Sequence, residues 1–146
     1  MMHRPVVMKE LVQYLRTAQK PLAGELGKVE REANEQEVPI IPHETVVFMQ
    51  FLLGQLKPKN ILEIGCAIGF SSSLMAQFIG ENGHVTTIDR FDVMIEKAKK
   101  TYERLGLTDK VTLLEGQAAD LLPTLTGPYD FIFMDSAKSK YIEFLP

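Results

Sequence analysis

The stretch that decides the fold runs from residue 60 to residue 71 and reads Asn-Ile-Leu-Glu-Ile-Gly-Cys-Ala-Ile-Gly-Phe-Ser. The largely apolar run at residues 61–64 predicts a short β-strand that ends at Gly65. Glycines at positions 65 and 69 allow the backbone to turn sharply and a ligand to approach it closely. A helix is expected to follow, over residues 71–79. The stretch therefore predicts a strand, a ligand-facing turn and a helix, in that order.

The same alternation of strand and helix continues toward the end of the chain. Further strands are predicted at residues 84–88, 111–114 and 131–134, and helices at 92–105, N-capped by Asp92, and at 119–125. Another helix is expected to begin within residues 138–145. Strands separated by helices imply right-handed βαβ units and a parallel sheet. Because the strands are continuously apolar, helices are expected on both faces of this α/β fold.

The N-terminal part has a different, helical pattern. Apolar residues at positions 22, 26, 29 and 33 form one stripe of a helix. A further helix over residues 44–56 is apolar nearly all round, which predicts that it is buried and that Phe48 and Phe51 belong to the core. We therefore divide the chain into a helical segment, residues 1–58, and a sheet-containing segment, residues 59–146.

Composition excludes several classes of protein. The 146 residues are 45% hydrophobic and 24% charged, with a formal net charge of −3, so no broad basic surface for nucleic acid is expected. One cysteine excludes an internal disulfide and a cysteine-based zinc site, and it fits a reducing compartment. We find no apolar run long enough to span a bilayer and no signal peptide. We expect a cytoplasmic protein that does not bind membranes.

The ends of the predicted strands locate a candidate site. Gly65, Asp89, Gly116 and Asp135 each follow a predicted strand. In open parallel sheets, ligands bind beyond the carboxyl ends of the strands, where the strand order reverses. A glycine pair or an acidic residue at one strand end has common structural explanations, such as a turn or a helix cap. Four such residues at one sheet edge favour a ligand site.

The spacing within this site favours a nucleoside without a pyrophosphate. The dinucleotide-binding pattern G-x-G-x-x-G is incomplete, because Ala67 and Phe70 occupy the second and third glycine positions. Asp89 follows Gly69 by 20 residues and can accept hydrogen bonds from a ribose diol. S-adenosylmethionine fits these features, with Glu63 near its cationic amino-acid end. A nicotinamide-dependent enzyme is the alternative that the missing glycines disfavour.

Two residues near the end of the fourth predicted strand, Asp135 and Lys138, have side chains that can take part in catalysis. Asp135 can ligate a hard divalent cation through oxygen. Lys138, three residues later, can face the same pocket and take a proton from a substrate hydroxyl if it is partly desolvated. The alternative for Lys138 is a solvated lysine at the start of a helix.

Four stretches, residues 39–41, 61–71, 85–90 and 129–138, together carry a family resemblance. The chain resembles the class I S-adenosylmethionine-dependent methyltransferases, which have a Rossmann-like sheet. It is most similar to the cation-dependent O-methyltransferases, which include the catechol and caffeoyl-CoA enzymes. Within that family it most resembles the bacterial branch that methylates 5-hydroxyuridine in tRNA.

The resemblance implies a role for each matching residue. Glu63, Gly65 and Ser71 would line the methionine end of the cofactor, Asp89 would hold the ribose, and residues 116–118 would border the adenine. The family's bacterial members usually have Asp where this chain has Gln117. Asp135 would be the first ligand of Mg²⁺ or a similar cation, and Lys138 would be the general base. The predicted cofactor-binding set is Ile41, Glu63, Gly65, Ala67, Gly69, Ser71, Asp89, Arg90, Gly116, Gln117, Ala118 and Asp135.

The chain also departs from the family pattern. The family sheet has seven strands, about four of which are predicted here, and its other metal ligands follow a strand beyond Pro146. We therefore expect a C-terminally truncated chain. One hypothesis is an active O-methyltransferase whose C-terminal part is absent. The other is an inactive fragment that at most binds cofactor and forms a homodimer through the exposed edge of its fourth strand. We expect the first to describe the family's function and the second to describe this polypeptide. The resemblance implies 5-hydroxyuridine in tRNA as the methyl acceptor, and a small hydroxylated aromatic molecule such as a catechol-like phenol is the alternative.

Overall fold

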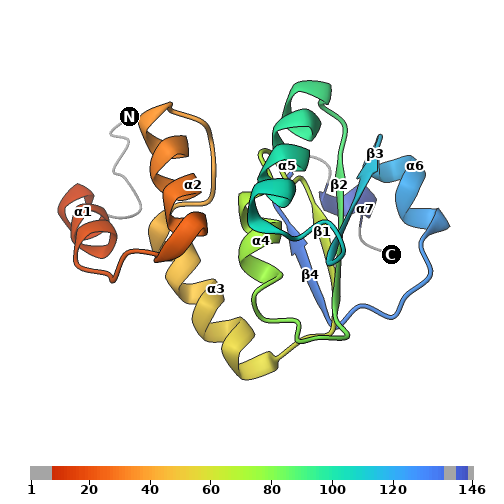
Figure 1. Cartoon of the computed structure of the whole chain (residues 1–146), viewed down its shortest axis with the longest axis horizontal. Helices are drawn as coiled ribbons and strands as arrows, with labels where there is room; N and C mark the ends of the chain where they lie inside the picture. Colours follow the sequence, from red (N-terminus) through yellow and green to blue (C-terminus); the bar gives the residue numbers. More distant parts are fainter. Residues whose placement is uncertain (1–7, 137–140, 145–146) are drawn as a thin grey trace.

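The computed structural model describes residues 8–136 and 141–144 of the chain. Figure 1 shows α1, α2 and α3 grouped at one end of the molecule, the sheet toward the other end, and α4 and α5 between them. In chain order the elements are α1 (Lys9–Thr17), α2 (Gly24–Glu35), α3 (His43–Leu56), β1 (Asn60–Ile64), α4 (Phe70–Met75), β2 (His84–Asp89), α5 (Asp92–Leu105), β3 (Val111–Glu115), α6 (Ala118–Leu121), a 3₁₀ turn (Leu122–Thr124), β4 (Phe131–Met134) and α7 (Tyr141–Phe144).

The sheet confirms the predicted α/β class. Its four strands are parallel and lie in the order β3-β2-β1-β4. Ile61 of β1 is paired with Val85 of β2 on one side and with Phe131 of β4 on the other. The chain moves outward from β1 to β3 and then returns to the opposite side of β1. The strand order therefore reverses between β1 and β4, which is where open parallel sheets bind ligands.

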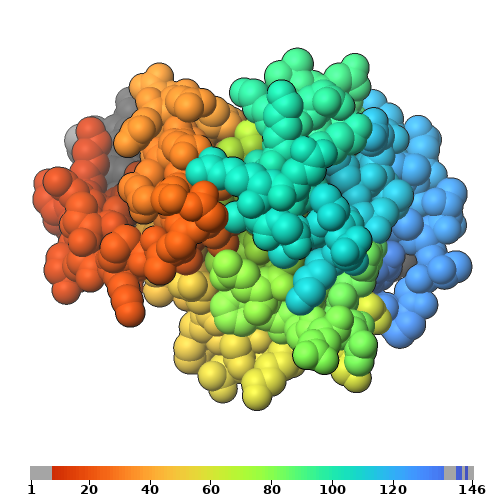
Figure 2. Space-filling model, viewed as in Figure 1, coloured from red at the N-terminus to blue at the C-terminus, as the bar shows by residue number. Residues whose placement is uncertain are grey.

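One hydrophobic core joins the helical and the sheet-containing segments. Met49 and Leu53 of α3 are buried in the same cluster as Phe70 and Leu74 of α4. Helix α2 contacts both α4 and α5. In the space-filling view the surfaces of α2 (orange) and α5 (teal) meet (Figure 2). The described residues of both segments, 1–58 and 59–146, contribute side chains to this core. The boundary between the two segments therefore marks a change of sequence pattern.

A salt-bridge cluster lies at the contact between α2 and α5. Arg104 of α5 donates to Glu32 at 2.7 Å and to Glu25 at 3.2 Å. All three side chains are substantially exposed to solvent, so the cluster contributes little to stability.

Three local predictions were wrong. The helix expected over residues 71–79 ends at Met75, because the chain turns before Gly80. Asp92 is the first residue of α5 rather than its N-cap, which is Phe91. Helix α3 is not buried all round, and Phe48 and Phe51 are 60% and 66% exposed instead of lying in the core. Among the described residues, no element covers the face of α3 that carries them.

The sequence predicted no apolar run long enough to span a bilayer, and the helices of the structure can be compared with this prediction. None of the helices over the described residues combines the length and the apolar character that crossing a bilayer requires.

Candidate functional site

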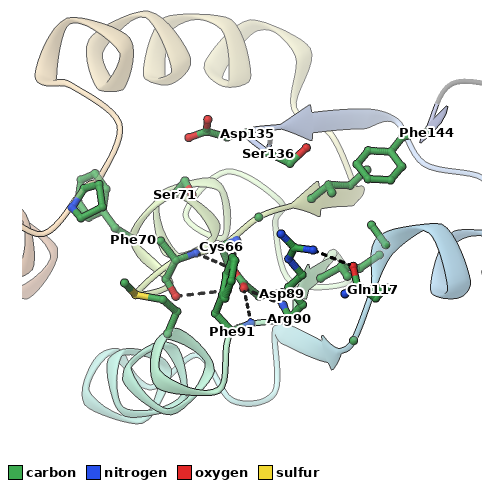
Figure 3. Close-up of a pocket in the computed structure, with 18 of the residues that line it drawn as sticks. Cys66, Phe70, Ser71, Asp89, Arg90, Phe91, Gln117, Asp135, Ser136 and Phe144 are labelled. Atoms are coloured by element: carbon green, nitrogen blue, oxygen red, sulfur yellow. Dashed lines mark hydrogen bonds between the residues drawn. The ribbon is translucent and has the colours of Figure 1, made fainter. Parts of the chain in front are cut away.

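A cavity of about 670 Å³ lies at the carboxyl edge of the sheet (Figure 3). Residues at or just after the ends of all four strands line it, together with the segment between α2 and α3 and Phe144 of α7. Its volume is in the range of small-molecule sites. All of the predicted cofactor-binding residues except Glu63 and Gly69 line it, namely Ile41, Gly65, Ala67, Ser71, Asp89, Arg90, Gly116, Gln117, Ala118 and Asp135.

Asp89 organises the two loops at the centre of the cavity. One carboxylate oxygen accepts the backbone N–H groups of Cys66 at 3.1 Å and Ala67 at 3.0 Å. The other accepts those of Arg90 at 2.7 Å and Phe91 at 3.0 Å. A carboxylate has about four lone-pair positions, so backbone groups already use them. A ribose diol bound at Asp89 would therefore share the carboxylate with the backbone N–H groups of the two loops.

Glu63 lies behind the cavity wall and has no exposed surface. One of its carboxylate oxygens accepts the Ser71 hydroxyl at 2.5 Å, and the other accepts the Thr87 hydroxyl at 2.5 Å. Burial raises the pKa of Glu63 to about 7, against the opposing effect of these hydrogen bonds. Ser71 lines the cavity and Glu63 does not. Glu63 therefore makes no direct contact with the cavity, and its hydrogen bond to Ser71 links it to the cavity wall.

The two glycines of the first loop are required by contacts within the protein. Gly65 has φ +92°, and a Cβ atom there would lie 2.3 Å from the carbonyl oxygen of Asp135. Gly69, the N-cap of α4, has φ +78°, and a Cβ atom there would lie 2.7 Å from the ring of Tyr102. The sequence prediction assigned both glycines to a sharp backbone turn and to the close approach of a ligand. Of the two, only Gly65 lines the cavity.

Aromatic and amide groups form one end of the cavity. The Arg90 guanidinium donates to the Gln117 side-chain oxygen at 3.2 Å, and Figure 3 shows this bond linking the ends of β2 and β3. Arg90 also lies over the ring of Phe91, with 4.8 Å from Cζ to the ring centroid. Met94 and Phe144 line the cavity as well. Such a surface suits a planar base.

Polar groups from α4 and from the end of β4 form another part of the cavity wall. Asp135 and Ser71 both line the cavity there, and the Asp135 side chain is exposed. Ser136 Oγ is buried and has no hydrogen-bond partner in the part of the chain that the structure describes. A buried polar atom without a partner is costly, which makes this part of the wall suited to a polar ligand group.

The proposed metal and base residues are only partly described. Lys138 lies outside the described residues. Across residues 8–136 and 141–144, no three His, Cys, Asp or Glu side chains come together in a way that could hold a metal ion. Asp135 therefore belongs to no such group within the described residues. Cys66 is buried, and burial raises the pKa of its thiol, as expected for a packing residue.

Sequence reasoning missed part of the cavity lining. Phe91 and Met94 line the cavity and follow Arg90 closely in sequence. Because Arg90 was predicted to bind the cofactor, the position of these two residues near the cavity could have been predicted as well. Phe144 lies about 50 residues beyond them, and no pattern in the sequence indicated that it reaches the same cavity.

Comparison with known proteins places this site in a family context. The model of the O-methyltransferase family matches residues 13–146. A catechol O-methyltransferase from Niastella koreensis is 35% identical over 117 residues, which are 77% of this chain and 52% of the relative. A catechol O-methyltransferase from Mycobacterium tuberculosis is 34% identical over 99 residues, which are 67% of this chain and 45% of the relative. The chain spans about half the length of these curated relatives.

Similarity extends to solved structures. A methyltransferase from Podospora anserina, crystallised with S-adenosylhomocysteine bound, superposes with a TM-score of 0.81 and 28% sequence identity. The superposition covers 92% of this chain and 59% of the other.

Proposed function

The chain belongs to the O-methyltransferase family, and we propose that it binds S-adenosylmethionine and transfers the methyl group to a hydroxyl oxygen. The observation that carries this proposal is the cavity at the carboxyl edge of the sheet, lined from the ends of all four strands. At about 670 Å³ it has room for a nucleoside with an amino-acid extension. When bound, the cofactor supplies an electrophilic methyl group on a sulfonium sulfur.

Two parts of the cavity fit the two ends of the cofactor. The adenine would lie among Phe91, Met94 and Phe144, beside the Gln117 amide. The ammonium group would lie near the Asp135 carboxylate and the Ser71 hydroxyl, where negative charge and hydrogen-bond acceptors attract it. Ile41 closes the cavity from the segment between α2 and α3. These contacts orient the methyl group and exclude water, and alignment of this kind is a large part of the rate enhancement in direct transfer.

We assign the general base to Lys138, which would take the proton from the attacking hydroxyl. The support is its spacing of three residues from Asp135 and its match to the lysine of catechol-type enzymes. Lys138→Met is expected to abolish methyl transfer while leaving the affinity for S-adenosylhomocysteine within twofold. Unchanged turnover in Lys138→Met would reject this assignment.

A divalent cation is the second element of the proposal. Asp135 is the ligand predicted from the sequence, and no group of three possible ligands is found among the described residues, so we derive no step through a metal. Treatment with EDTA is expected to abolish methyl transfer, and Mg²⁺ is expected to restore it. Activity that persists after EDTA would exclude the cation requirement.

We propose a small phenol with two adjacent hydroxyl groups as the methyl acceptor, because two of the relatives are catechol O-methyltransferases. A 5-hydroxyuridine in tRNA is the second candidate, although the net charge of −3 does not favour nucleic acid. Radiolabelled S-adenosylmethionine would be incubated with the chain and either catechol or tRNA that contains 5-hydroxyuridine. Label in catechol alone supports the first acceptor, and label in tRNA alone supports the second. Either result would reject the hypothesis that the 146-residue chain is an inactive fragment.

We also propose that the chain forms a homodimer through the edge of β4. Strand β4 is at one edge of the sheet formed by the described residues, and its Ile132 is 57% exposed. Apolar, unpaired strand edges favour pairing with another chain.

A further inference from the structure

The segment between α2 and α3 is held by backbone hydrogen bonds only at its two ends. Its residues 39–41, which we name the wall segment, line the cavity at the carboxyl edge of the sheet. Within the described residues, none of these three forms a backbone hydrogen bond. Before them the Val38 N–H donates to the Ala33 carbonyl of α2 at 2.8 Å, and after them the Pro42 carbonyl accepts from the first turn of α3. Apart from the packing of its side chains, the wall segment is therefore positioned by α2 and α3.

A buried pair of side chains links α2 directly to the start of α3. Glu30 of α2 and His43, the first residue of α3, have side chains that are 8% and 14% exposed. His43 Nδ1 lies 2.7 Å from a carboxyl oxygen of Glu30, and His43 Nε2 lies 3.1 Å from the carbonyl oxygen of Lys20. A carbonyl only accepts, so Nε2 donates to it, while Nδ1 and the Glu30 carboxyl share one further proton. Because His43 follows Pro42, the pair fixes the end of the wall segment to α2.

The Glu30–His43 pair supplies a contact that apolar packing does not. Both helices contact α4, but their backbones have few contacts with each other. Burying an ionisable pair is costly, and it adds less to stability than apolar side chains of the same volume often would. A hydrogen bond has a preferred direction, however, so it favours one relative position of the two helices. The pair is therefore suited to positioning.

The wall segment has space into which it could shift. A second cavity, of about 600 Å³, is lined by Glu30 and His43 and also by Pro39 and Ile40 of the wall segment. The same two wall residues line the cavity at the carboxyl edge of the sheet. Since the wall segment borders both cavities, side-chain packing alone restrains it less than it would in a filled core.

We propose that Glu30 and His43 are positioning residues that hold the wall segment in place for the cofactor. Neither of them lines the cavity at the carboxyl edge of the sheet, so both act at a distance from the ligand. This inference rests on the proposed function, since it concerns the affinity for S-adenosylmethionine. Breaking the pair lowers the fraction of folded chains in which the wall segment is in place, and the affinity falls by that fraction.

Glu30→Met removes the partner of His43 and keeps a side chain of similar length that favours a helix. The full chain and the variant would each be titrated calorimetrically with S-adenosylhomocysteine, after circular dichroism has shown that both are folded. We expect about tenfold weaker binding in the variant, as when the wall segment is in place in about a tenth of the chains. A lower unfolding temperature with unchanged affinity would show that the pair only stabilises the fold, and would overturn the proposal.

Two substitutions of His43 separate its two contacts. Asparagine carries its amide at the position of Nδ1, toward Glu30, whereas glutamine carries its amide at the position of Nε2, toward the Lys20 carbonyl. His43→Asn is expected to keep the affinity for S-adenosylhomocysteine within about threefold, and His43→Gln to lose about tenfold. The reverse order would overturn the role of Glu30. If Glu30→Met does not fold, His43→Gln provides the same comparison.

Ile41→Ala tests whether the pair acts through the wall segment. Ile41 lines the cavity and is buried. If Glu30 acts by positioning this side chain, Glu30→Met weakens binding less in the Ile41→Ala background than in the unchanged chain, because the two losses are coupled. Losses that multiply would show that Glu30 affects the ligand by another route, and would overturn the proposal.

Glu44→Gln is the matched control. Glu44 follows His43 on α3 and pairs with Arg16 of α1 at 3.0 Å, but it lines neither cavity. Its loss is expected to leave the affinity for S-adenosylhomocysteine within twofold. A tenfold loss in Glu44→Gln would show that any ion pair at the start of α3 has this effect, and would overturn the specific role of Glu30 and His43.

Hydrogen exchange separates this inference from the proposed function. The N–H groups of Thr45 and Val46 donate to the Pro42 carbonyl at 2.9 Å and 3.1 Å, so their exchange reports on the end of the wall segment without any ligand. Both are expected to exchange about tenfold faster in Glu30→Met, and equal exchange in the two proteins would overturn the positioning. If the unchanged chain does not bind S-adenosylhomocysteine, the proposed function fails, whereas unchanged affinity in Glu30→Met rejects this inference alone.

Discussion

Glu63 makes the stability of the chain depend on pH. Burial raises its pKa from the ordinary value of 4.5 to about 7. Between these two values the folded chain holds a proton that the unfolded chain has released. The free energy of unfolding therefore falls as the pH rises from about 4.5 to about 7, by roughly 3 kcal/mol from this group.

Glu63→Gln is expected to remove this contribution. The free energy of unfolding in urea would be measured at pH 5 and at pH 8 for the unchanged chain and for the variant. We predict that the loss between the two pH values is smaller in Glu63→Gln, since the amide does not titrate. An equal loss in both proteins would show that Glu63 keeps an ordinary pKa in the folded chain.

At the scale of single residues, the sequence predicted positions better than roles. The position of Asp89 at the end of a strand was predictable, because an acidic residue after an apolar run is visible in the sequence. Its four backbone donors depend on how two loops approach each other, which no local pattern encodes. Glu63 was expected near the ligand, but its burial depends on tertiary contacts, including those with Ser71 of α4 and Thr87 of β2.

The loop between β1 and α4 depends on close packing at Gly69. Gly69 and Gly80 both have positive φ, at +78° and +71°, but only a Cβ at position 69 would meet another side chain, Tyr102. Gly80→Ala is expected to lower the free energy of unfolding by about 1 to 2 kcal/mol from backbone strain alone. Gly69→Ala is expected to cost about 1 to 3 kcal/mol more, from steric overlap with the ring.

Denaturation in urea would measure both variants, with Gly80→Ala as the control for backbone strain. Equal losses in the two variants would show that Tyr102 moves aside without cost, and that the loop does not depend on this contact.

The elements themselves were largely predictable from periodicity. All four strands were predicted within a residue or two, because each is an apolar run bounded by glycine or polar residues. The exposed face of α3 was not predictable, because a helix that is apolar nearly all round gives no indication of which face stays uncovered. The shortening of α4 follows from turns near Gly80 that compete with the helix.

At the scale of the whole molecule, the exposed edge of β4 predicts self-association. Ile132→Lys is expected to shift the chain from dimer to monomer in sedimentation experiments, because a charged side chain at a strand edge opposes pairing. Val93→Lys is the control, since Val93 is 68% exposed but lies on α5, away from the edge. A monomer at every concentration of the unchanged chain would reject the dimer, and dissociation by both variants would reject the edge.

We propose that the cavity at the carboxyl edge of the sheet binds the nucleoside and the amino-acid end of S-adenosylmethionine. Calorimetric titration of the folded 146-residue chain with S-adenosylhomocysteine, and separately with NAD, tests it most directly. We predict saturable binding of S-adenosylhomocysteine with a raised unfolding temperature, because a ligand that binds only the folded state stabilises it. We predict no response to NAD, because the glycines that support a pyrophosphate are missing. A chain that is folded by circular dichroism but does not respond to S-adenosylhomocysteine, or that binds NAD instead, would contradict the account.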